Sequence, residues 1–217
     1  MNTLFVGDLH GCLYTFKDFL NKHWNGEDRI VQVGDLCDRG NHTYELVEYA
    51  IKLKEEYPSN FVFLMGNHEH EIILHDKTGF NYNWYSQCGH KTMLEYVSRM
   101  DEFRKHCSWF VKLPLTWEND FIVASHAGYS IFNTNETKWG DEESVLWTRS
   151  PLRNIGKLQI VGHTPQRSGK PTYCKDSNAW FIDTAAYKGL YLTALKFNEA
   201  GNLLEIIQVP THKKDIS

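Results

Sequence analysis

The chain has 217 residues, of which 41% are hydrophobic and 23% charged, the composition of an ordinary globular domain with a sizeable core. A formal net charge of -4 gives no electrostatic basis for binding nucleic acid or an anionic membrane surface. No segment reaches the roughly 20 apolar residues of a spanning helix, and we expect no signal peptide because the first residues lack a basic leader. We therefore expect a single domain over 1–210, a flexible tail at 211–217, and no membrane or nucleic-acid partner.

Strand and helix signals alternate over the first third of the chain. Short apolar runs that end in Gly-Asp or Gly-Asn predict strands at 3–8, 29–35 and 60–67, with amphipathic helices after the first two at 13–24 and 43–57. Asn41 or Thr43 is expected to cap the second helix and Pro58 to stop it. Successive β-α units predict a parallel sheet with right-handed crossovers.

The rest of the chain has a different pattern. The stretch 76–90 is polar and aromatic and contains glycine, which predicts an ordered loop, and 91–112 is expected to be helical. Apolar strands without long helices between them follow at 121–128, 158–165 and 179–186, and a hairpin is expected over 190–209. The predicted fold is α/β, with two packed mixed sheets flanked by helices as an α/β/β/α sandwich.

Side chains of metal-ligating types stand at the ends of five of these strands: Asp8 with His10, Asp35, Asn67, His126 and His163. Taken singly, each is an ordinary turn or helix start, but ligands of α/β sheets bind beyond the carboxyl ends of strands. Oxygen and imidazole ligands without a thiolate suit divalent Mn, Fe, Zn or Mg rather than a closed structural zinc site. Two ions about 3.5–4 Å apart, bridged by one carboxylate, would use all six side chains and activate water for in-line attack on phosphorus.

The cysteines and remaining histidines do not form a further site. The five cysteines are scattered and contain no CxxC pair, so they predict reduced thiols in a cytoplasmic protein. The seven histidines outside the motifs are expected at the surface or in the core.

Five short motifs in order carry a family resemblance: "GDLHG" (7–11), "GDLCDRG" (34–40), "GNHE" (66–69), "HAG" (126–128) and "GHT" (162–164). They resemble the calcineurin-like metallophosphoesterases and, more narrowly, the PPP-type serine/threonine protein phosphatases with their small bacterial and phage lambda-type members. The resemblance extends over about 3–198 and includes "LPL" (113–115), "LWTR" (146–149) and "FIDTAA" (181–186). The stretch "WYSQCGHKTMLEY" (84–96) resembles a drifted form of the Trp, Asn-Gly-Gly, Thr-Leu stretch of the small members. Three positions depart from the family pattern: Ala185 and Cys88 replace glycines, and Ser150 replaces an acidic residue.

The resemblance implies a role for each strand-end residue. Asp8 and His10 would bind a first metal ion, Asp35 would bridge two ions, and the second ion would be completed by Asn67, His126 and His163. Manganese is the expected metal, with iron, zinc or magnesium as alternatives.

The same resemblance implies the residues that act on the phosphoester. His68 would be the general acid, oriented by Asp38, because imidazolium is well suited to protonate a leaving alkoxide near neutral pH. Arg39 and Arg149 would bind the phosphate oxygens. The alternative readings are that Asp38 only caps the following helix and that Arg149, anchored by "WTR" alone, is structural.

Neighbouring residues are expected to support the site rather than to react. Glu69 is predicted to act at the start of its helix or as a partner of the site, and Asp183 to support the metal site through hydrogen bonds. His70 and His75 are expected to face solvent or to pack, and packing is the expected role of Trp84, Tyr85 and Tyr187.

Asp38 distinguishes between the candidate substrates. Symmetrical dinucleoside tetraphosphate hydrolases usually have alanine at this position, and nuclease-like relatives have aspartate where this chain has Glu69. We therefore predict a phosphomonoesterase that hydrolyses phosphoserine and phosphothreonine in proteins, extending to phosphotyrosine or small phosphoesters, through a hydroxide bridging two metals. The alternatives are a symmetrical dinucleoside tetraphosphate hydrolase and a non-catalytic metal-dependent binding module. A monomer is expected.

Overall fold

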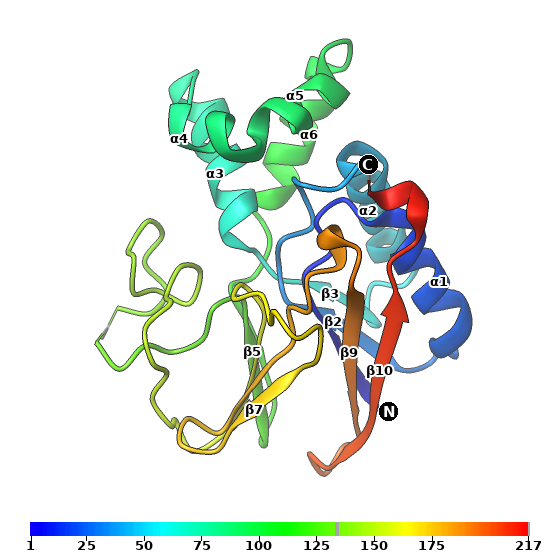
Figure 1. The fold of residues 1–217 in the computed structure, drawn as a ribbon, viewed down its shortest axis with the longest axis vertical. Coiled ribbons are helices and arrows are strands. Elements are labelled where there is room, and N and C mark those ends of the chain that lie inside the picture. The colour runs from blue at the N-terminus through cyan, green and yellow to red at the C-terminus, as the bar shows by residue number, and fades with distance from the viewer. Residues whose placement is uncertain (133–134, 217) are drawn as a thin grey trace.

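Two five-stranded mixed sheets pack face to face and are flanked by helices, as the sequence predicts (Figure 1). The structure is a computed structural model that describes residues 1–132 and 135–216. The first sheet has the order β10-β9-β1-β2-β3, with strands at Thr3–Val6 (β1), Arg29–Gln32 (β2), Phe61–Phe63 (β3), Tyr191–Phe197 (β9) and Leu203–Pro210 (β10). The second has the order β4-β5-β6-β8-β7, with strands at Thr116–Glu118 (β4), Ile122–Ser125 (β5), Leu158–Val161 (β6), Thr172–Cys174 (β7) and Ala179–Phe181 (β8).

The direction of the strands places the motif residues together. β1, β2 and β3 run parallel, which confirms the prediction from the β-α units, and β9 pairs antiparallel with both β1 and β10. In the second sheet, β5, β6 and β8 are parallel. The residues after β1, β2, β5 and β6 therefore emerge at the carboxyl edges of two parallel blocks, where a shared site can form.

The two faces of the first sheet enclose different parts of the core. Phe5 points toward the second sheet and packs with residues such as Ile160, whereas Leu4 and Val6 point toward the helices. This alternation follows from the two-residue period of a β-strand. Both faces of β1 are thus buried, so the position of the loop that follows it is firmly set.

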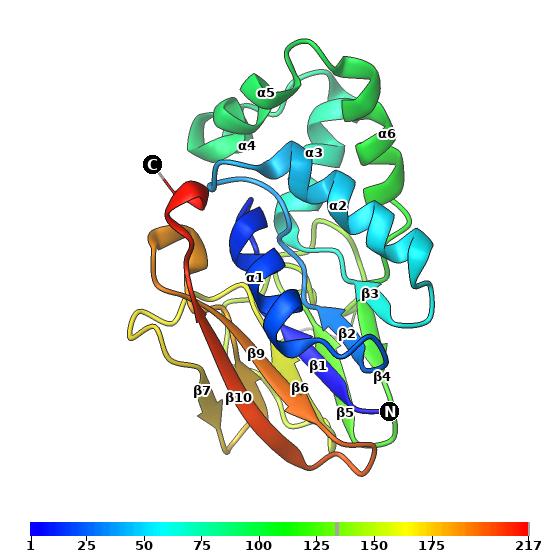
Figure 2. The same cartoon turned by 90° about the vertical axis from the view of Figure 1, so that its right-hand side faces the viewer.

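The α-helices in the described residues all come from the first 110 residues, and none of them is long and apolar enough to cross a membrane. Figures 1 and 2 show α3 to α6 gathered into a lobe beyond one end of the sheets. The bounds are Leu13–His23 (α1), Thr43–Glu56 (α2), Asn67–Thr78 (α3), Tyr82–Trp84 (α4), His90–Tyr96 (α5) and Met100–Phe110 (α6).

The expectation of a loop at 76–90 was wrong, because most of this stretch is helical. α3 continues to Thr78, α4 follows, and a π-helical turn, η1 (Tyr85–Gly89), joins α4 to α5. The Asn81 side chain accepts the backbone N–H of Trp84 and so caps α4. The helix expected over 91–112 is divided between α5 and α6.

Distant carboxylates cap the first two helices. The Asp215 carboxylate, which is fully buried, accepts the backbone N–H groups of Tyr14 and Thr15 at 3.0 and 2.7 Å. At α2, Glu95 Oε2 accepts the N–H of Tyr44 at 2.8 Å, whereas no side chain at the N-cap position itself does so, contrary to the expected local cap. Asp215 belongs to a short 3-10 turn, η3 (Lys213–Asp215), so this part of the expected tail is packed on α1.

Candidate active site

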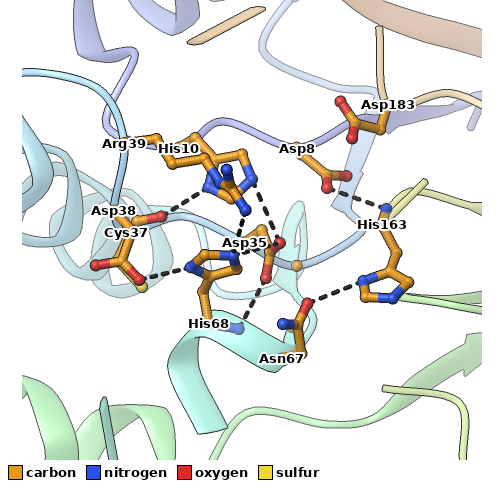
Figure 3. Close-up of polar contacts among 12 residues, drawn as sticks. Asp8, His10, Asp35, Cys37, Asp38, Arg39, Asn67, His68, His163 and Asp183 are labelled. Atoms are coloured by element: carbon orange, nitrogen blue, oxygen red, sulfur yellow. Dashed lines mark hydrogen bonds and ion pairs between the residues drawn. The ribbon is translucent and has the colours of Figure 1, made fainter. Parts of the chain in front are cut away.

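The strand-end residues converge in one site between the two sheets and the start of α3 (Figure 3). Their backbone is unusual, because the left-handed region costs a non-glycine residue roughly 1–2 kcal/mol. Residues held there by their surroundings cluster at functional sites. Five of the predicted site residues have positive φ: His10 (42°), Asp35 (57°), Asp38 (70°), Arg39 (67°) and His163 (63°).

Asp35 lies at the centre of the site. Its Oδ2 is 3.4 Å from His10 Nε2, and its Oδ1 is 3.3 Å from His126 Nε2. Two groups of ligand-type side chains share it: Asp35 with His10 and His68, and Asp35 with His126 and His163. Burial opposes ionisation, but the imidazoles of His126 and His68 hold the pKa of Asp35 well below its usual range.

Backbone carbonyl groups orient the three imidazoles predicted as ligands. A carbonyl can only accept, so His10 Nδ1 donates to Cys37 O at 2.9 Å and His126 Nδ1 donates to Val33 O at 2.9 Å. His163 Nε2 likewise donates to Trp147 O at 3.1 Å. The second nitrogen of each ring can then face the centre as a lone pair, which is the arrangement that metal-binding histidines adopt. Burial lowers the pKa of His10 to about 3 and also lowers that of His163, which favours the neutral rings.

In the centre of the site, more hydrogen-bond acceptors lie close together than there are protons to be shared among them. Asn67 Oδ1 lies 2.9 Å from both His126 Nε2 and His163 Nδ1, and these two nitrogens are 3.1 Å apart. Burial lowers the pKa of His126, but Asp35 outweighs this effect and the pKa is raised. One proton on that ring could still serve only part of this cluster. Convergent lone pairs from carboxylate, amide and imidazole fit divalent cations, and the donor set therefore suits the metals that the motifs predict.

Asp8 lies at the side of this centre, outside the two groups that share Asp35. Its Oδ2 accepts the backbone N–H of His163 at 3.0 Å, while its buried Oδ1 has no hydrogen-bond partner among the described residues. Figure 3 shows Asp183 beside it. Burial and the Asp183 charge raise the pKa of Asp8. A Cβ at Gly162 would overlap Asp8 Oδ1, so glycine is required for this approach.

His68 and Asp38 form a buried pair. His68 Nδ1 is 2.6 Å from Asp38 Oδ2, and Asp38 is 0% exposed. Burial opposes both charges, but Asp35 and Asp38 raise the pKa of His68, and the His68 hydrogen bond lowers the pKa of Asp38. The Asp38 carboxylate thus contacts side chains rather than the first turn of α2, which disfavours the reading of Asp38 as a simple helix cap.

The two predicted phosphate-binding arginines approach from different sides. Arg39 Nη2 is 3.2 Å from His68 Nε2, and the guanidinium lies 4.8 Å from the centre of the Tyr187 ring. Tyr187 also packs edge-on against His10. It therefore packs as predicted, but the residues that it packs against belong to the site. Arg149 donates to His163 O at 3.4 Å and borders a cavity of about 390 Å³ whose apolar walls include Leu152 and Phe181.

Glu69 holds the loop after β2 in place. Its Oε2 accepts the backbone N–H groups of Asp35 and Gly66 at 2.9 and 2.8 Å, and its Oε1 accepts that of Leu36 at 2.9 Å. A Cβ at Gly66 would overlap Asp35 Oδ1, so the start of α3 must approach the loop without a side chain. Glu69 therefore supports the position of Asp35, as expected of this carboxylate. His70 and His75 are buried against aromatic rings.

Three residues near Asp38 were not predicted as part of the site. Trp84 Nε1 donates to Asp38 Oδ2 at 2.7 Å, Thr92 Oγ1 donates to Oδ1, and Cys88 Sγ lies 3.5 Å from Oδ2. Packing is the role that the sequence predicts for Trp84. The sequence does contain a signal, because Trp84, Cys88 and Thr92 are spaced four apart and would share one face of a helix. The signal was missed because 76–90 was expected to be a loop.

Comparison with known proteins defines the class of the chain. Residues 1–197 match the calcineurin-like phosphoesterase family, and the chain belongs to that family. A serine/threonine-protein phosphatase homologue from Encephalitozoon cuniculi is 26% identical over 70% of the chain, which spans 36% of the relative's length. A bis(5'-nucleosyl)-tetraphosphatase (asymmetrical) from Halalkalibacterium halodurans is 25% identical and covers 98% of this chain and 95% of its own.

A solved structure supports the fold. A serine/threonine phosphatase from Saccharomyces cerevisiae with similarity to human phosphatase PP5 superposes with a TM-score of 0.73 at 18% identity, covering 98% of this chain and 81% of its own. The predicted metallophosphoesterase fold is therefore confirmed, as is the resemblance to PPP-type phosphatases. Membership of the family implies a hydrolase of phosphoesters that depends on divalent metals.

Proposed function

We propose that this chain is a metal-dependent phosphomonoesterase that removes phosphate from phosphoserine and phosphothreonine in proteins. The observation that carries the proposal is the buried Asp38–His68 pair, with its 2.6 Å contact beside the Asp35 centre. A monoester with an alkoxide leaving group needs a positioned proton donor, and a carboxylate that fixes Nδ1–H leaves Nε2 to supply the proton.

Six side chains would hold two divalent ions, with manganese as the proposed metal. Asp8, His10 and Asp35 would bind the first ion, with Asp35 shared, and the second would be completed by Asn67, His126 and His163. When bound, the ions would lower the pKa of a water molecule and neutralise charge on the phosphoryl oxygens.

The remaining residues would bind the phosphate and move the proton. Arg39 and Arg149 would donate to non-bridging phosphate oxygens, whose geometry matches a guanidinium fork. The oxygen of water forms the new bond to phosphorus while the bond to the seryl or threonyl oxygen breaks. His68 Nε2 gives its proton to that leaving oxygen, and Asp38 stabilises and orients the imidazolium ring.

A second candidate is hydrolysis of dinucleoside tetraphosphates. It is supported by the nearly full-length match to a relative with that name. The bond broken would then be a phosphoanhydride, whose phosphate leaving group needs protonation less than an alkoxide does. The buried Asp38–His68 pair thus favours the phosphomonoester.

We also propose that the chain acts as a monomer in the cytoplasm, where its five free cysteines would stay reduced.

The deciding experiment compares manganese-dependent rates on three substrates: a phosphoserine peptide, a phosphotyrosine peptide and diadenosine tetraphosphate. The phosphoserine peptide should be the best substrate, and chelation of the metal should abolish its turnover. Dominant cleavage of the tetraphosphate would select the second candidate. Full turnover by metal-free protein would contradict both.

A further inference from the structure

The carboxylate of Asp38 receives hydrogen bonds from two directions. His68 Nδ1 and Trp84 Nε1 contact Oδ2 at 2.6 and 2.7 Å, while the Thr92 hydroxyl donates to Oδ1. Trp84 and Thr92 are 2% and 1% exposed, so these donors are shielded from solvent. Capping of α2 does not explain these contacts, because the Asp38 carboxylate bonds to side chains and not to the first turn of that helix.

The two donors come from the continuous helical segment formed by α4, η1 and α5. Trp84 ends α4 and Thr92 lies in the first turn of α5, so they are eight residues apart on one face of the segment. Cys88, midway between them, places its Sγ 3.5 Å from Asp38 Oδ2 and 3.7 Å from His68 Nδ1. A rigid helical face that contacts both oxygens prevents the carboxylate plane from rotating.

We propose that Trp84 and Thr92 are positioning residues for proton transfer: they fix the Asp38 carboxylate so that it orients His68 toward the leaving group. The inference rests on the proposed phosphomonoesterase function. With one oxygen held by Thr92 and the other by Trp84, a single direction remains for the His68 N–H, and Nε2 is aimed at the Asp35 centre. A loosened Asp38 would let the ring turn, and a small loss of alignment is costly in catalysis.

The test uses aryl phosphates with different leaving groups, because only a poor leaving group needs the proton. Trp84→Phe keeps an aromatic ring but removes the indole N–H. Thr92→Val keeps the branched shape but removes the hydroxyl. Turnover of phenyl phosphate should fall about tenfold in each, a part of the 10²–10⁴ typical of a general acid. Turnover of 2,4-dinitrophenyl phosphate should change less than about twofold.

Two controls separate positioning from folding. Thr92→Ser keeps the hydroxyl and should retain near-native turnover of phenyl phosphate. Trp24→Phe removes an indole N–H that donates to Asp28 O at 2.9 Å, remote from the site, and should leave both rates unchanged. Equal losses on the two substrates in Trp84→Phe would overturn the proposal.

A spectroscopic measurement is independent of turnover. In protein loaded with diamagnetic magnesium or zinc, Asp38→Asn should move the indole N–H resonance of Trp84 and leave that of Trp24 in place. An unmoved Trp84 resonance would overturn the positioning role. If the resonance moves but the native chain hydrolyses no phosphomonoester, the contact is supported and the proposed function is the part that fails.

Discussion

Arg39 Nη2 lies 3.2 Å from Nε2 of His68, the nitrogen that would carry the proton for the leaving group. A guanidinium is a permanent donor, so this contact is favourable only while Nε2 has no proton. The raised pKa of His68, caused by Asp35 and Asp38 against the effect of burial, favours a protonated ring. Protonation of His68 at Nε2 therefore requires the Arg39 guanidinium to move away from that nitrogen. A phosphate group could then bind Arg39, because its oxygens match the paired N–H donors of a guanidinium.

Replacing Arg39 with alanine should lower kcat/KM for phenyl phosphate about 10- to 150-fold, because a hydrogen bond to a charged group contributes about 1.5–3 kcal/mol. Inhibition by inorganic phosphate should weaken in parallel. Steady-state kinetics check both. Arg104→Ala, which removes an exposed arginine paired with Asp101, is the control and should behave as native. Unchanged phosphate inhibition in Arg39→Ala would remove Arg39 from the phosphate site.

His68→Asn should lower kcat by roughly 10²–10⁴ on phenyl phosphate, since the proton donor is lost. The metal content, measured by elemental analysis, should remain that of the native protein. His90→Asn, at an exposed position, should change neither quantity. Because His68 Nε2 is 3.9 Å from Asp35 Oδ2, loss of metal would instead show that His68 is a ligand.

The sequence predicted which side chains would meet at the ends of the strands, and the reason is local. Asp8, Asp35 and His163 each follow a strand and a glycine directly, so short motifs were enough to locate them. The contacts of Trp84 and Thr92 with Asp38 were missed because glycine and polar residues obscure the helical period of 82–96, and a π-turn interrupts it.

The helix caps could not be predicted for a different reason. Capping rules examine the residues beside a helix terminus, whereas α1 is capped by Asp215 from the other end of the chain. The left-handed backbone at Asp38 and Arg39 is likewise accompanied by tertiary contacts, such as the 3.0 Å hydrogen bond from Gly40 N to His10 O. Local propensity is too weak to indicate such conformations, although aspartate adopts them more often than most residue types.

Ala185→Gly should stabilise the protein. Ala185 has φ 57° and ψ 51°, a left-handed conformation that costs alanine about 1–2 kcal/mol, while glycine gives back about 0.5–1 kcal/mol through the freedom of the unfolded chain. A net gain of up to about 1 kcal/mol in the free energy of unfolding is expected in urea titrations. Ala50→Gly, inside α2, should instead lose about 1 kcal/mol or more. A lower free energy of unfolding in Ala185→Gly would show that contacts of the Ala185 Cβ stabilise the protein by more than the left-handed backbone costs.

Glu95→Gln should change the pH dependence of stability. Burial raises the pKa of Glu95 to about 7 from 4.5, so between these values the folded protein keeps a proton that the unfolded chain releases. The free energy of unfolding should therefore fall as pH rises from about 4.5 to 7 and then level off. Glutamine can still accept the Tyr44 N–H, and its variant should lose this slope. Unfolding titrations at several pH values test it, with the exposed Glu55→Gln as the control. An unaltered slope would rule out Glu95 as its source.

The strand order of the first sheet has a consequence for synthesis on the ribosome. β1 emerges first, yet one of its two neighbours is β9, which begins only at Tyr191 (Figure 2). Until that late strand arrives, the backbone N–H and C=O groups along one side of β1 are open to pairing with another chain. Asp8 and His10, at the end of β1, are thus translated long before β9, the strand that completes the pairing of β1. A nascent chain of this protein is expected to need shielding by a chaperone until the C-terminal hairpin closes the sheet.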